Sequence, residues 1–195
     1  MFLVIEGADG VGKTTLAKRL AEKYNAVMFS LPEASTSAGA LFRQWMHEHA
    51  NRSPEEWAHL AAASYNELRP RIEALLNDGA TVICDRYVHS DYAYRARQGW
   101  SFEKTHDFHS KWYQPIIQPD LALWLDCPID IAQQRIINRE GRGNLTIFER
   151  PEMQEHVRID YRVMANHPEV FNLTRIDASQ SADAVFADAV KAIEG

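Results

Sequence analysis

One short stretch near the N-terminus decides the fold: Gly7-Ala8-Asp9-Gly10-Val11-Gly12-Lys13-Thr14. It matches the pattern G-x-x-x-x-G-K-[ST] without a mismatch. An apolar run, Phe2–Ile5, precedes it, and a helical pattern over Lys13–Tyr24 follows it. Glycines let backbone amides curl around phosphate oxygens, and the N-terminus of a helix adds a positive field. Strand, glycine-rich loop and helix together predict the phosphate-binding loop of a P-loop nucleotide-binding fold.

The end of this loop indicates what it binds. Lys13 is placed to reach the β- and γ-phosphates of a nucleoside triphosphate, and the Thr14 hydroxyl to ligate Mg²⁺. Thr15 follows and completes the predicted ATP-binding segment. GTPases, ATPases and kinases share the motif, so by itself it predicts triphosphate binding and no more. The chain has no guanine-reading Asn-Lys-x-Asp sequence, which argues against a switch GTPase.

The rest of the chain alternates between strand-like and helix-like patterns. Besides Phe2–Ile5, four short runs are continuously apolar: Val27–Phe29, Thr81–Cys84, Leu121–Leu125 and Leu173–Ile176. Such runs are typical of buried parallel strands, whereas half-exposed strands alternate between apolar and polar residues. We therefore expect five parallel strands.

Helical patterns lie between these runs. Ser53-Pro54-Glu55-Glu56 is a capping box with proline at the first helical position, and predicts a long helix that stops at Asn77-Asp78-Gly79. Ala182–Glu194 carries an apolar stripe, with Ser181 as its predicted cap. The alternation implies an α/β fold, a P-loop NTPase fold whose parallel sheet is covered by helices on both faces. The 195 residues suit a single domain over residues 1–195.

Composition narrows the classes of function. The chain is 46% hydrophobic and 25% charged, as globular proteins usually are. Its net charge of −6 argues against a general nucleic-acid binder. No stretch approaches the roughly 20 apolar residues that span a bilayer, and we see no signal peptide. The two cysteines, Cys84 and Cys127, form neither a zinc set nor a disulfide framework. We therefore expect a cytoplasmic protein that binds neither nucleic acid nor membrane.

A second motif, Asp85-Arg86-Tyr87, directly follows the predicted strand Thr81–Cys84. Its side chains should lie at the carboxyl edge of the sheet beside the phosphate loop, where ligands bind in such folds. Asp85 there can hold a water bound to Mg²⁺, and Arg86 can grip the phosphate that accepts a phosphoryl group. Asp126 also ends a strand, but Cys127-Pro128 after it indicates a helix start, so we expect Asp126 to be a cap.

Together these motifs resemble the thymidylate kinase family. The resemblance rests on Glu6 through Thr15, and on Asp85-Arg86-Tyr87 followed by Ser90 and Ala93-Tyr94. Weaker matches follow in order: Pro119-Asp120-Leu121, Leu125-Asp126 and Ile176-Asp177-Ala178-Ser179. The resemblance spans almost the whole chain. It implies a doubly wound sheet of five strands, a homodimer, and transfer of the γ-phosphate of ATP to dTMP with Mg²⁺.

The resemblance also implies a lid, at about residues 138–149, around Arg139-Glu140-Gly141-Arg142-Gly143. Arginines on a closing flap neutralise charge on the transferring phosphoryl group once substrate is bound. Some family members carry that arginine inside the phosphate loop, where this chain has Asp9 and Gly10. We therefore expect Arg139 and Arg142 to be catalytic, with Arg135 in reserve. By the same resemblance, Asp177 and Ala178 would flank the adenine of ATP, although an ordinary loop before the last helix fits them almost as well.

The acceptor side follows from the resemblance as well. Asp9 would hold the 3′-hydroxyl of the acceptor sugar, although aspartate there is also good turn chemistry. Arg86 and Arg43 would bind the acceptor phosphate, unless Arg43 is only a surface charge of its helix. Leu31 and Tyr94 would complete this part of the site.

Two departures from the family pattern fall in this acceptor pocket. Relatives place an aromatic residue and, four positions later, an arginine on the long helix before Asp-Arg-Tyr. Ungapped counting from Asp85 puts Ala61 and Tyr65 there, whereas Tyr65 and Arg69, one turn later, have the required spacing. Both registers stay open at this point, and Tyr65 is a candidate in each. The second departure is Ala34, which stands where relatives use an arginine on the acceptor phosphate.

These departures keep other functions in view. One is a kinase for another deoxynucleoside monophosphate, with a modified pyrimidine or a purine as its base. Another is a deoxynucleoside kinase, for which Glu33 lies about where a general base is needed. A regulatory P-loop module that binds nucleotide and a protein partner is the non-enzyme alternative. A nucleic-acid-end kinase would need a basic groove, which the net charge of −6 does not suggest.

Overall fold

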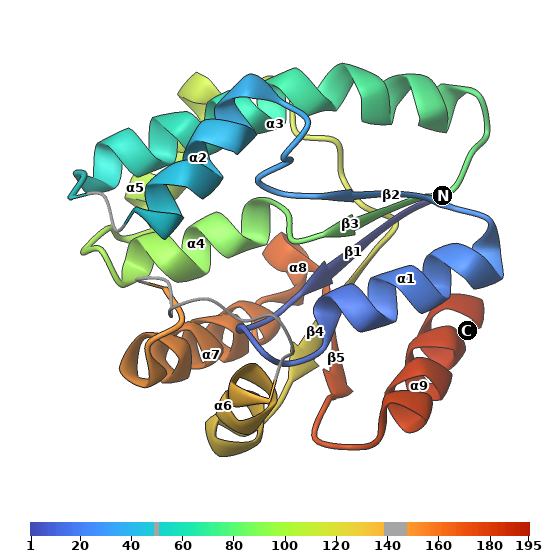
Figure 1. Cartoon of the computed structure of the whole chain (residues 1–195). Coiled ribbons are helices and arrows are strands. Elements are labelled where there is room, and N and C mark those ends of the chain that lie inside the picture. The colour runs from blue at the N-terminus through green and yellow to red at the C-terminus, as the bar shows by residue number, and fades with distance from the viewer. Residues whose placement is uncertain (49–50, 139–147) are drawn as a thin grey trace.

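The sheet of this computed structural model is all parallel. The structure describes residues 1–48, 51–138 and 148–195. Within these residues, five strands pair in the order β2-β3-β1-β4-β5 (Figure 1). They are β1 (Phe2–Glu6), β2 (Val27–Ser30), β3 (Val82–Asp85), β4 (Leu121–Asp126) and β5 (Leu173–Asp177). The predicted five-stranded sheet is confirmed.

Each strand runs one residue beyond its predicted apolar run, into a polar side chain. These terminal residues are Glu6, Ser30, Asp85, Asp126 and Asp177. Strand pairing requires only backbone groups, so the ladder continues past the last apolar residue; Ile5 and Ser30, for example, each pair with Asp85. Because the strands are parallel, all five polar ends lie at one edge of the sheet, which is where a ligand site is expected.

The helices among the described residues are α1 (Lys13–Tyr24), α2 (Ser37–His47), α3 (Pro54–Asn77), α4 (Val88–Ala96), α5 (Phe102–Trp112), α6 (Ile129–Ile137), α7 (Pro151–Ala165), α8 (Pro168–Phe171) and α9 (Ala182–Glu194). The three helices whose ends were predicted, α1, α3 and α9, begin and end close to those positions. The predicted capping box of α3 is present, with Ser53 and Glu56 each bonded to the other's backbone amide. Ser181 caps α9 through the Ala184 amide, also as predicted.

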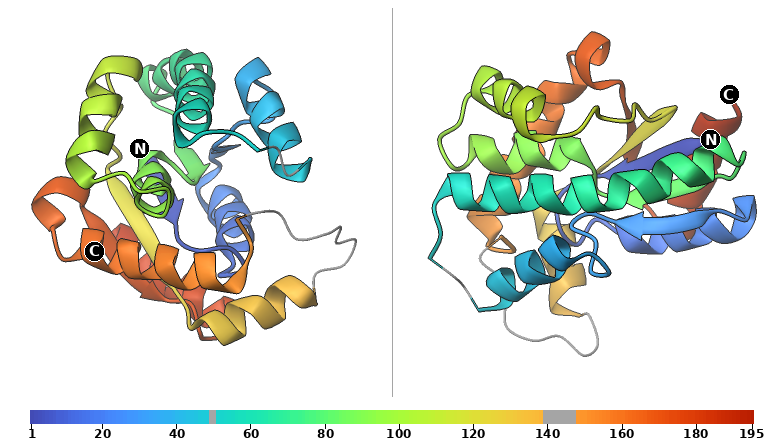
Figure 2. Two further views of the ribbon diagram at one scale, coloured as in Figure 1. Left: turned by 90° about the vertical axis from the view of Figure 1, so that its left-hand side faces the viewer. Right: turned by 90° about the horizontal axis from the view of Figure 1, so that it is seen from above.

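Helices cover the sheet on both sides (Figure 2). α1 packs against α9, while α4 packs against α3, α5 and α7. The central strands are fully enclosed by this arrangement, and Ile5, Ile83 and Leu123 have essentially no exposed surface. The continuously apolar strand sequences follow from this enclosure. Among the described residues, no helix is long and apolar enough to cross a membrane.

Candidate active site

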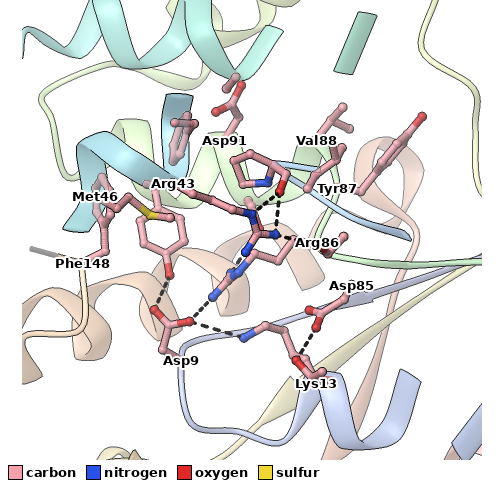
Figure 3. Close-up of a pocket in the computed structure, with 18 of the residues that line it drawn as sticks. Asp9, Lys13, Arg43, Met46, Asp85, Arg86, Tyr87, Val88, Asp91 and Phe148 are labelled. Atoms are coloured by element: carbon pink, nitrogen blue, oxygen red, sulfur yellow. Dashed lines mark hydrogen bonds and ion pairs between the residues drawn. The ribbon is translucent and has the colours of Figure 1, made fainter. Parts of the chain in front are cut away.

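A cavity of about 780 Å³ opens at the carboxyl edge of the sheet (Figure 3). Its floor is the loop between β1 and α1, and its sides come from the loop after β2, from α2 and α3, and from α4. The fold thus brings the two main sequence motifs, Gly7–Thr14 and Asp85-Arg86-Tyr87, to one site. It also adds residues from segments that neither motif includes.

The phosphate loop has the backbone that its glycines predict. Gly10 has φ +80°, and a side chain there would run into the carbonyl oxygen of Ala132 on α6. Lys13 lies under the loop, where its ammonium donates to the carbonyl oxygen of Ala8 at 2.6 Å. Burial and the Arg86 charge together lower the pKa of Lys13 to about 8, because the neighbouring carboxylates only partly offset them. A bound phosphate would favour the protonated, charged form of Lys13. The loop is therefore suited to bind an anion.

The side chains of Thr14 and Asp85 meet at the start of α1 and the end of β3. The Thr14 hydroxyl donates to the Asp85 carboxylate at 2.5 Å. Mg²⁺ bound with a nucleotide needs only one or two protein oxygens, since phosphates and waters complete its octahedron. A hydroxyl and a carboxylate suit this requirement. The described residues contain no cluster of three or more His, Cys, Asp or Glu that could hold a metal by itself.

Arg86 points from the end of β3 toward the phosphate loop. Its backbone is left-handed, with φ 71°, and its guanidinium donates to the carbonyl oxygen of Gly7 at 3.0 Å and to Asp9. Its charge also lies over the Tyr94 ring, 5.3 Å from the centroid. Burial raises the pKa of Asp9, but the charges of Arg86 and Lys13 outweigh it and hold that pKa below its usual range. Asp9 is therefore ionised, and Tyr94 donates to its other oxygen.

Glu6 holds the turn that carries Arg86. Its carboxylate is fully buried and accepts from the Tyr87 amide at 2.7 Å, the Ser90 hydroxyl at 2.7 Å and the Tyr161 hydroxyl at 2.6 Å. Burial raises the pKa of Glu6, but bonds and charge from its neighbours, chiefly His89, outweigh it and leave the pKa lowered. The sequence signal for this role is an acidic residue at the end of a buried strand.

Arg43 on α2 turns into the cavity. Its guanidinium donates to the Ser30 hydroxyl at 2.8 Å and to the Pro32 carbonyl oxygen at 2.7 Å and 3.0 Å. It lines the cavity together with Leu31 and Tyr94, which were also predicted for the acceptor side. The alternative, that Arg43 is a solvated surface charge, does not match this placement.

The family model described as thymidylate kinase matches residues 5–189. A probable thymidylate kinase of Pyrococcus abyssi is 35% identical, over 99% of this chain and 95% of its own length. A thymidylate kinase of Acinetobacter baylyi is 31% identical, over 100% of this chain and 98% of its own.

This chain belongs to the thymidylate kinase family. The fold agrees: the solved structure of thymidylate kinase from Candida albicans superposes with a TM-score of 0.84 at 24% identity, covering 99% of this chain and 90% of that one. The P-loop NTPase fold inferred from the sequence is thereby confirmed.

Within this family framework, the structure corrects one prediction about the acceptor base. Tyr65 is fully buried behind the cavity, where its hydroxyl accepts from the Ile117 amide at 3.1 Å and donates to the Pro115 carbonyl oxygen at 3.1 Å. Arg69 donates to the same Pro115 carbonyl oxygen at 3.0 Å. Neither residue lines the cavity, whereas Ala61 does. Neither register therefore brings both of its residues to the cavity, and Tyr65 and Arg69 are not placed to read the base.

Other predictions fall outside the cavity or outside the described residues. Asp126 is not a helix cap, because it accepts from Arg158 at 2.6 Å and from Arg175 at 2.7 Å. Glu33 accepts from the amides of Ser30 and Ser35 in its own loop and does not line the cavity, so the general base of a deoxynucleoside kinase is not in place. The two lid arginines, Arg139 and Arg142, lie outside the described residues.

The residues predicted to flank adenine, and the reserve arginine Arg135, come from α6 and from the end of β5 and the residue after it. Arg135 lines the cavity, and its guanidinium donates to the Ala178 carbonyl oxygen at 2.8 Å. Ala178 is fully buried, whereas Asp177 is exposed and accepts from the Ser179 amide and hydroxyl. Neither Asp177 nor Ala178 lines the cavity directly.

The sequence reasoning missed an aromatic wall. Phe148, near the C-terminal end of the predicted lid, lines the cavity with Phe42 and Met46 of α2. Its ring meets those of Trp57 and Tyr94 edge-on, both at centroid distances of 5.5 Å. No local pattern marks Phe148 as a site residue, because its neighbours come from α2, α3 and α4.

A second missed residue is Gln154 on α7, which is fully buried. Its amide oxygen accepts from the Asp9 backbone amide, and its amide nitrogen donates to the Asp9 carboxylate at 3.0 Å and to the Phe148 carbonyl oxygen. Gln154 therefore connects the phosphate loop to the C-terminal end of the predicted lid.

Proposed function

We propose that this protein phosphorylates dTMP to dTDP, with ATP as donor and Mg²⁺ as cofactor. Membership of the thymidylate kinase family supports the reaction class, since that family consists of nucleoside monophosphate kinases. The observation that carries the proposal is the shared cavity. Lys13 and the phosphate loop line one side of it, and Arg43 and Arg86 line the side next to them. A donor phosphate and an acceptor phosphate can thus meet in line, as phosphoryl transfer requires.

The residues divide into a donor group and an acceptor group. On the donor side, the amides of residues 7–15 and the ammonium of Lys13 bind the ATP phosphates. Thr14 and Asp85 would hold Mg²⁺, directly or through water, and the ion would neutralise charge on the transferring group. We further propose that Asp177 and Ala178 flank adenine, and that Arg139 and Arg142 supply positive charge from the lid.

On the acceptor side, Arg86 and Arg43 bind the 5′-phosphate, since guanidinium forks suit phosphate oxygens. Asp9 is ionised and is positioned by Tyr94 and Gln154, so it can accept from the 3′-hydroxyl of a deoxyribose. Leu31 and Phe148 bound the space beyond the sugar.

We also propose that residues 1–195 form one kinase domain, and that the enzyme is a cytoplasmic homodimer without nucleic-acid or membrane partners. The family resemblance supports the dimer, and the composition supports the cytoplasm.

The test is a panel of acceptors with ATP and Mg²⁺, followed by ADP release. It should include dTMP, dUMP, dCMP, dAMP, dGMP, 5-modified pyrimidine monophosphates and the matching nucleosides. We expect dTMP to give the highest kcat/KM. Preference for another monophosphate would mean that the acceptor is a different nucleotide, with the reaction class unchanged. Activity on nucleosides alone would overturn the acceptor assignment.

The pKa of Lys13 predicts how ATP affinity depends on pH. The protonated form binds phosphate, and a pKa of about 8 in the free enzyme means that this form is lost as the pH rises. From pH 7 to pH 9, the Kd for ATP should rise about tenfold, while the terminal phosphate of ATP is already ionised across that range. Calorimetric titration at several pH values measures this. A Lys13→Met variant is the control and should show no such trend; a flat profile for the unaltered enzyme would contradict the assignment.

Phe148 should contribute to acceptor binding. Replacing it with leucine should raise the KM for dTMP about tenfold and leave kcat nearly unchanged, because a base–aromatic contact contributes about 1–3 kcal/mol. The matched control is Phe102→Leu, since Phe102 stacks on Tyr92 away from the cavity. Equal KM values for the two variants would show that the Phe148 ring does not contact the acceptor.

A further inference from the structure

Three polar side chains line the cavity away from the phosphate loop. They are Asp91 and Arg95, one turn apart on α4, and Tyr113, which follows α5. In Figure 3, Asp91 lies across the cavity from Lys13, with Arg86 between them. The phosphates of both substrates must lie near Lys13 and Arg86, so the acceptor base extends toward the Asp91 end. Ala61 of α3 also lines the cavity, and its methyl group can neither stack on a base nor bond to it.

The carboxylate of Asp91 is saturated by protein donors. One oxygen accepts from two guanidinium nitrogens of Arg95, both at 3.4 Å. The other accepts from the His109 ring at 3.2 Å and from the Tyr113 hydroxyl. Burial raises the pKa of Asp91, but these partners, led by Arg95, outweigh it, so the group stays ionised. A carboxylate has about four lone-pair sites, and none remains for a ligand.

Because Asp91 is saturated in this way, the hydrogen-bonding groups that Tyr113 and Arg95 can present to the cavity are determined. Burial raises the pKa of Tyr113 well above its usual value, so the hydroxyl keeps its proton, which it gives to Asp91. Within the described part of the chain nothing else bonds to that hydroxyl, so toward the cavity Tyr113 can only accept. Arg95 gives its other donors to the Pro54 carbonyl oxygen and to Gln98. Of its five N–H groups, one on Nη2 has no partner among the described residues, so Arg95 can only donate.

We propose that Tyr113 and Arg95 read the base of the acceptor, with Asp91 as the residue that positions both. An acceptor and a donor that share one carboxylate lie side by side, as the two groups on a pyrimidine edge do. Thymine presents N3–H as a donor beside O4 as an acceptor. The hydroxyl of Tyr113 accepts from N3–H, and the guanidinium of Arg95 donates to O4.

The same pair rejects cytosine. Cytosine has an amino group at position 4 and an unprotonated N3, so it presents the two functions in reverse order. In the same pose its amino group would face the Arg95 donor, and its N3 lone pair the lone pairs of Tyr113. Both contacts are mismatched, and a site that leaves buried polar groups unpaired discriminates strongly. This inference rests on the proposed function and identifies which residues of this chain replace the base readers missing from α3.

The first test needs no variant. With the unaltered enzyme, kcat/KM for N3-methyl-dTMP should be on the order of 100-fold below that for dTMP, because the methyl group replaces the donated hydrogen. The kcat/KM for dCMP should lie below that for dTMP by at least about the same factor. Comparable rates for dTMP and N3-methyl-dTMP would overturn the inference while leaving the proposed kinase function intact. If no monophosphate is phosphorylated, the proposed function fails and the inference fails with it.

The second test uses Tyr113→Phe, which removes only the hydroxyl. The KM for dTMP should rise about tenfold with kcat nearly unchanged, as for one lost hydrogen bond. Discrimination against N3-methyl-dTMP should fall to about tenfold or less, because the ring edge can then accommodate the methyl group. A merely structural role would leave this ratio unchanged, and an unchanged ratio would overturn the proposal.

The matched control is Tyr92→Phe. Tyr92 lies on α4 beside Asp91, and among the described residues its hydroxyl bonds only to His106, at 3.4 Å and outside the cavity. Its ratio of dTMP to N3-methyl-dTMP activity should equal that of the unaltered enzyme, and thermal unfolding should confirm that both variants are folded.

Discussion

Replacing Lys13 with methionine should lower kcat for dTMP phosphorylation on the order of a thousandfold. The Lys13 ammonium lies beneath the phosphate loop, where it can follow the charge that develops on the transferring group. A fixed charge in a water-poor site is typically responsible for a factor of about 10²–10³ in rate. The KM for ATP should also rise, because part of the contact exists before transfer.

The fold should survive this change. Lys13 is 7% exposed, and burial makes its charge costly in the free enzyme. Methionine has a similar length and no charge to desolvate, so the melting temperature should not fall. Lys18→Met is the matched control, because Lys18 is exposed on the same helix. ADP release and thermal unfolding measure the two effects, and a Lys13→Met enzyme with kcat within about tenfold of normal would refute the assignment.

Replacing Arg86 with methionine should lower kcat/KM for dTMP by a factor on the order of 10²–10³ while leaving the KM for ATP within about threefold. Arg86 is the residue that reaches both the phosphate loop, through Gly7 and Asp9, and the acceptor side of the cavity. Arg86→Lys should restore little of this activity, because an ammonium cannot form the two parallel contacts of a guanidinium.

Loss of Arg86 also leaves Asp9 without its strongest neighbouring charge. The double variant Arg86→Met with Asp9→Asn separates the two effects. If the double variant recovered activity, the role of Arg86 would be to neutralise Asp9 and not to bind the acceptor phosphate. Arg97→Met is the control for loss of an arginine: Arg97 is paired with Asp160 at 2.8 Å, outside the cavity. Its kcat/KM should stay within about twofold of normal.

Local sequence patterns determined much of this protein's structure. The glycine-rich loop, the five apolar runs and the capping box at Ser53 each act through neighbours a few residues away, so the sequence alone determined the sheet, the phosphate loop and the start of α3. Asp85 and Arg86 were also recognisable, because the residue after a buried parallel strand must lie at the carboxyl edge.

The acceptor pocket was decided by tertiary packing. α3 has buried side chains on several faces, among them Trp57, Tyr65 and Leu68, so its sequence does not say which face meets the cavity. The direction of Tyr65 was set by bonds to Pro115 and Ile117, about 50 positions further along the chain. From the sequence alone, a tyrosine followed four residues later by an arginine is equally compatible with ligand binding and with packing in the core, because both side chains are amphipathic.

The same distinction separates the residues that were found from those that were missed. Lys13 and Thr14 are defined by one continuous motif. Phe148 lines the cavity because α2, α3 and α4 converge on it, and Tyr113 lines it beside Asp91 of α4 and Tyr65 of α3. The sequence by itself determined the phosphate-loop backbone at the N-terminus of α1, since that loop depends on residues that are adjacent in the chain. Only the tertiary structure decided which side chains line the proposed acceptor side of the cavity, since these come from elements far apart in sequence.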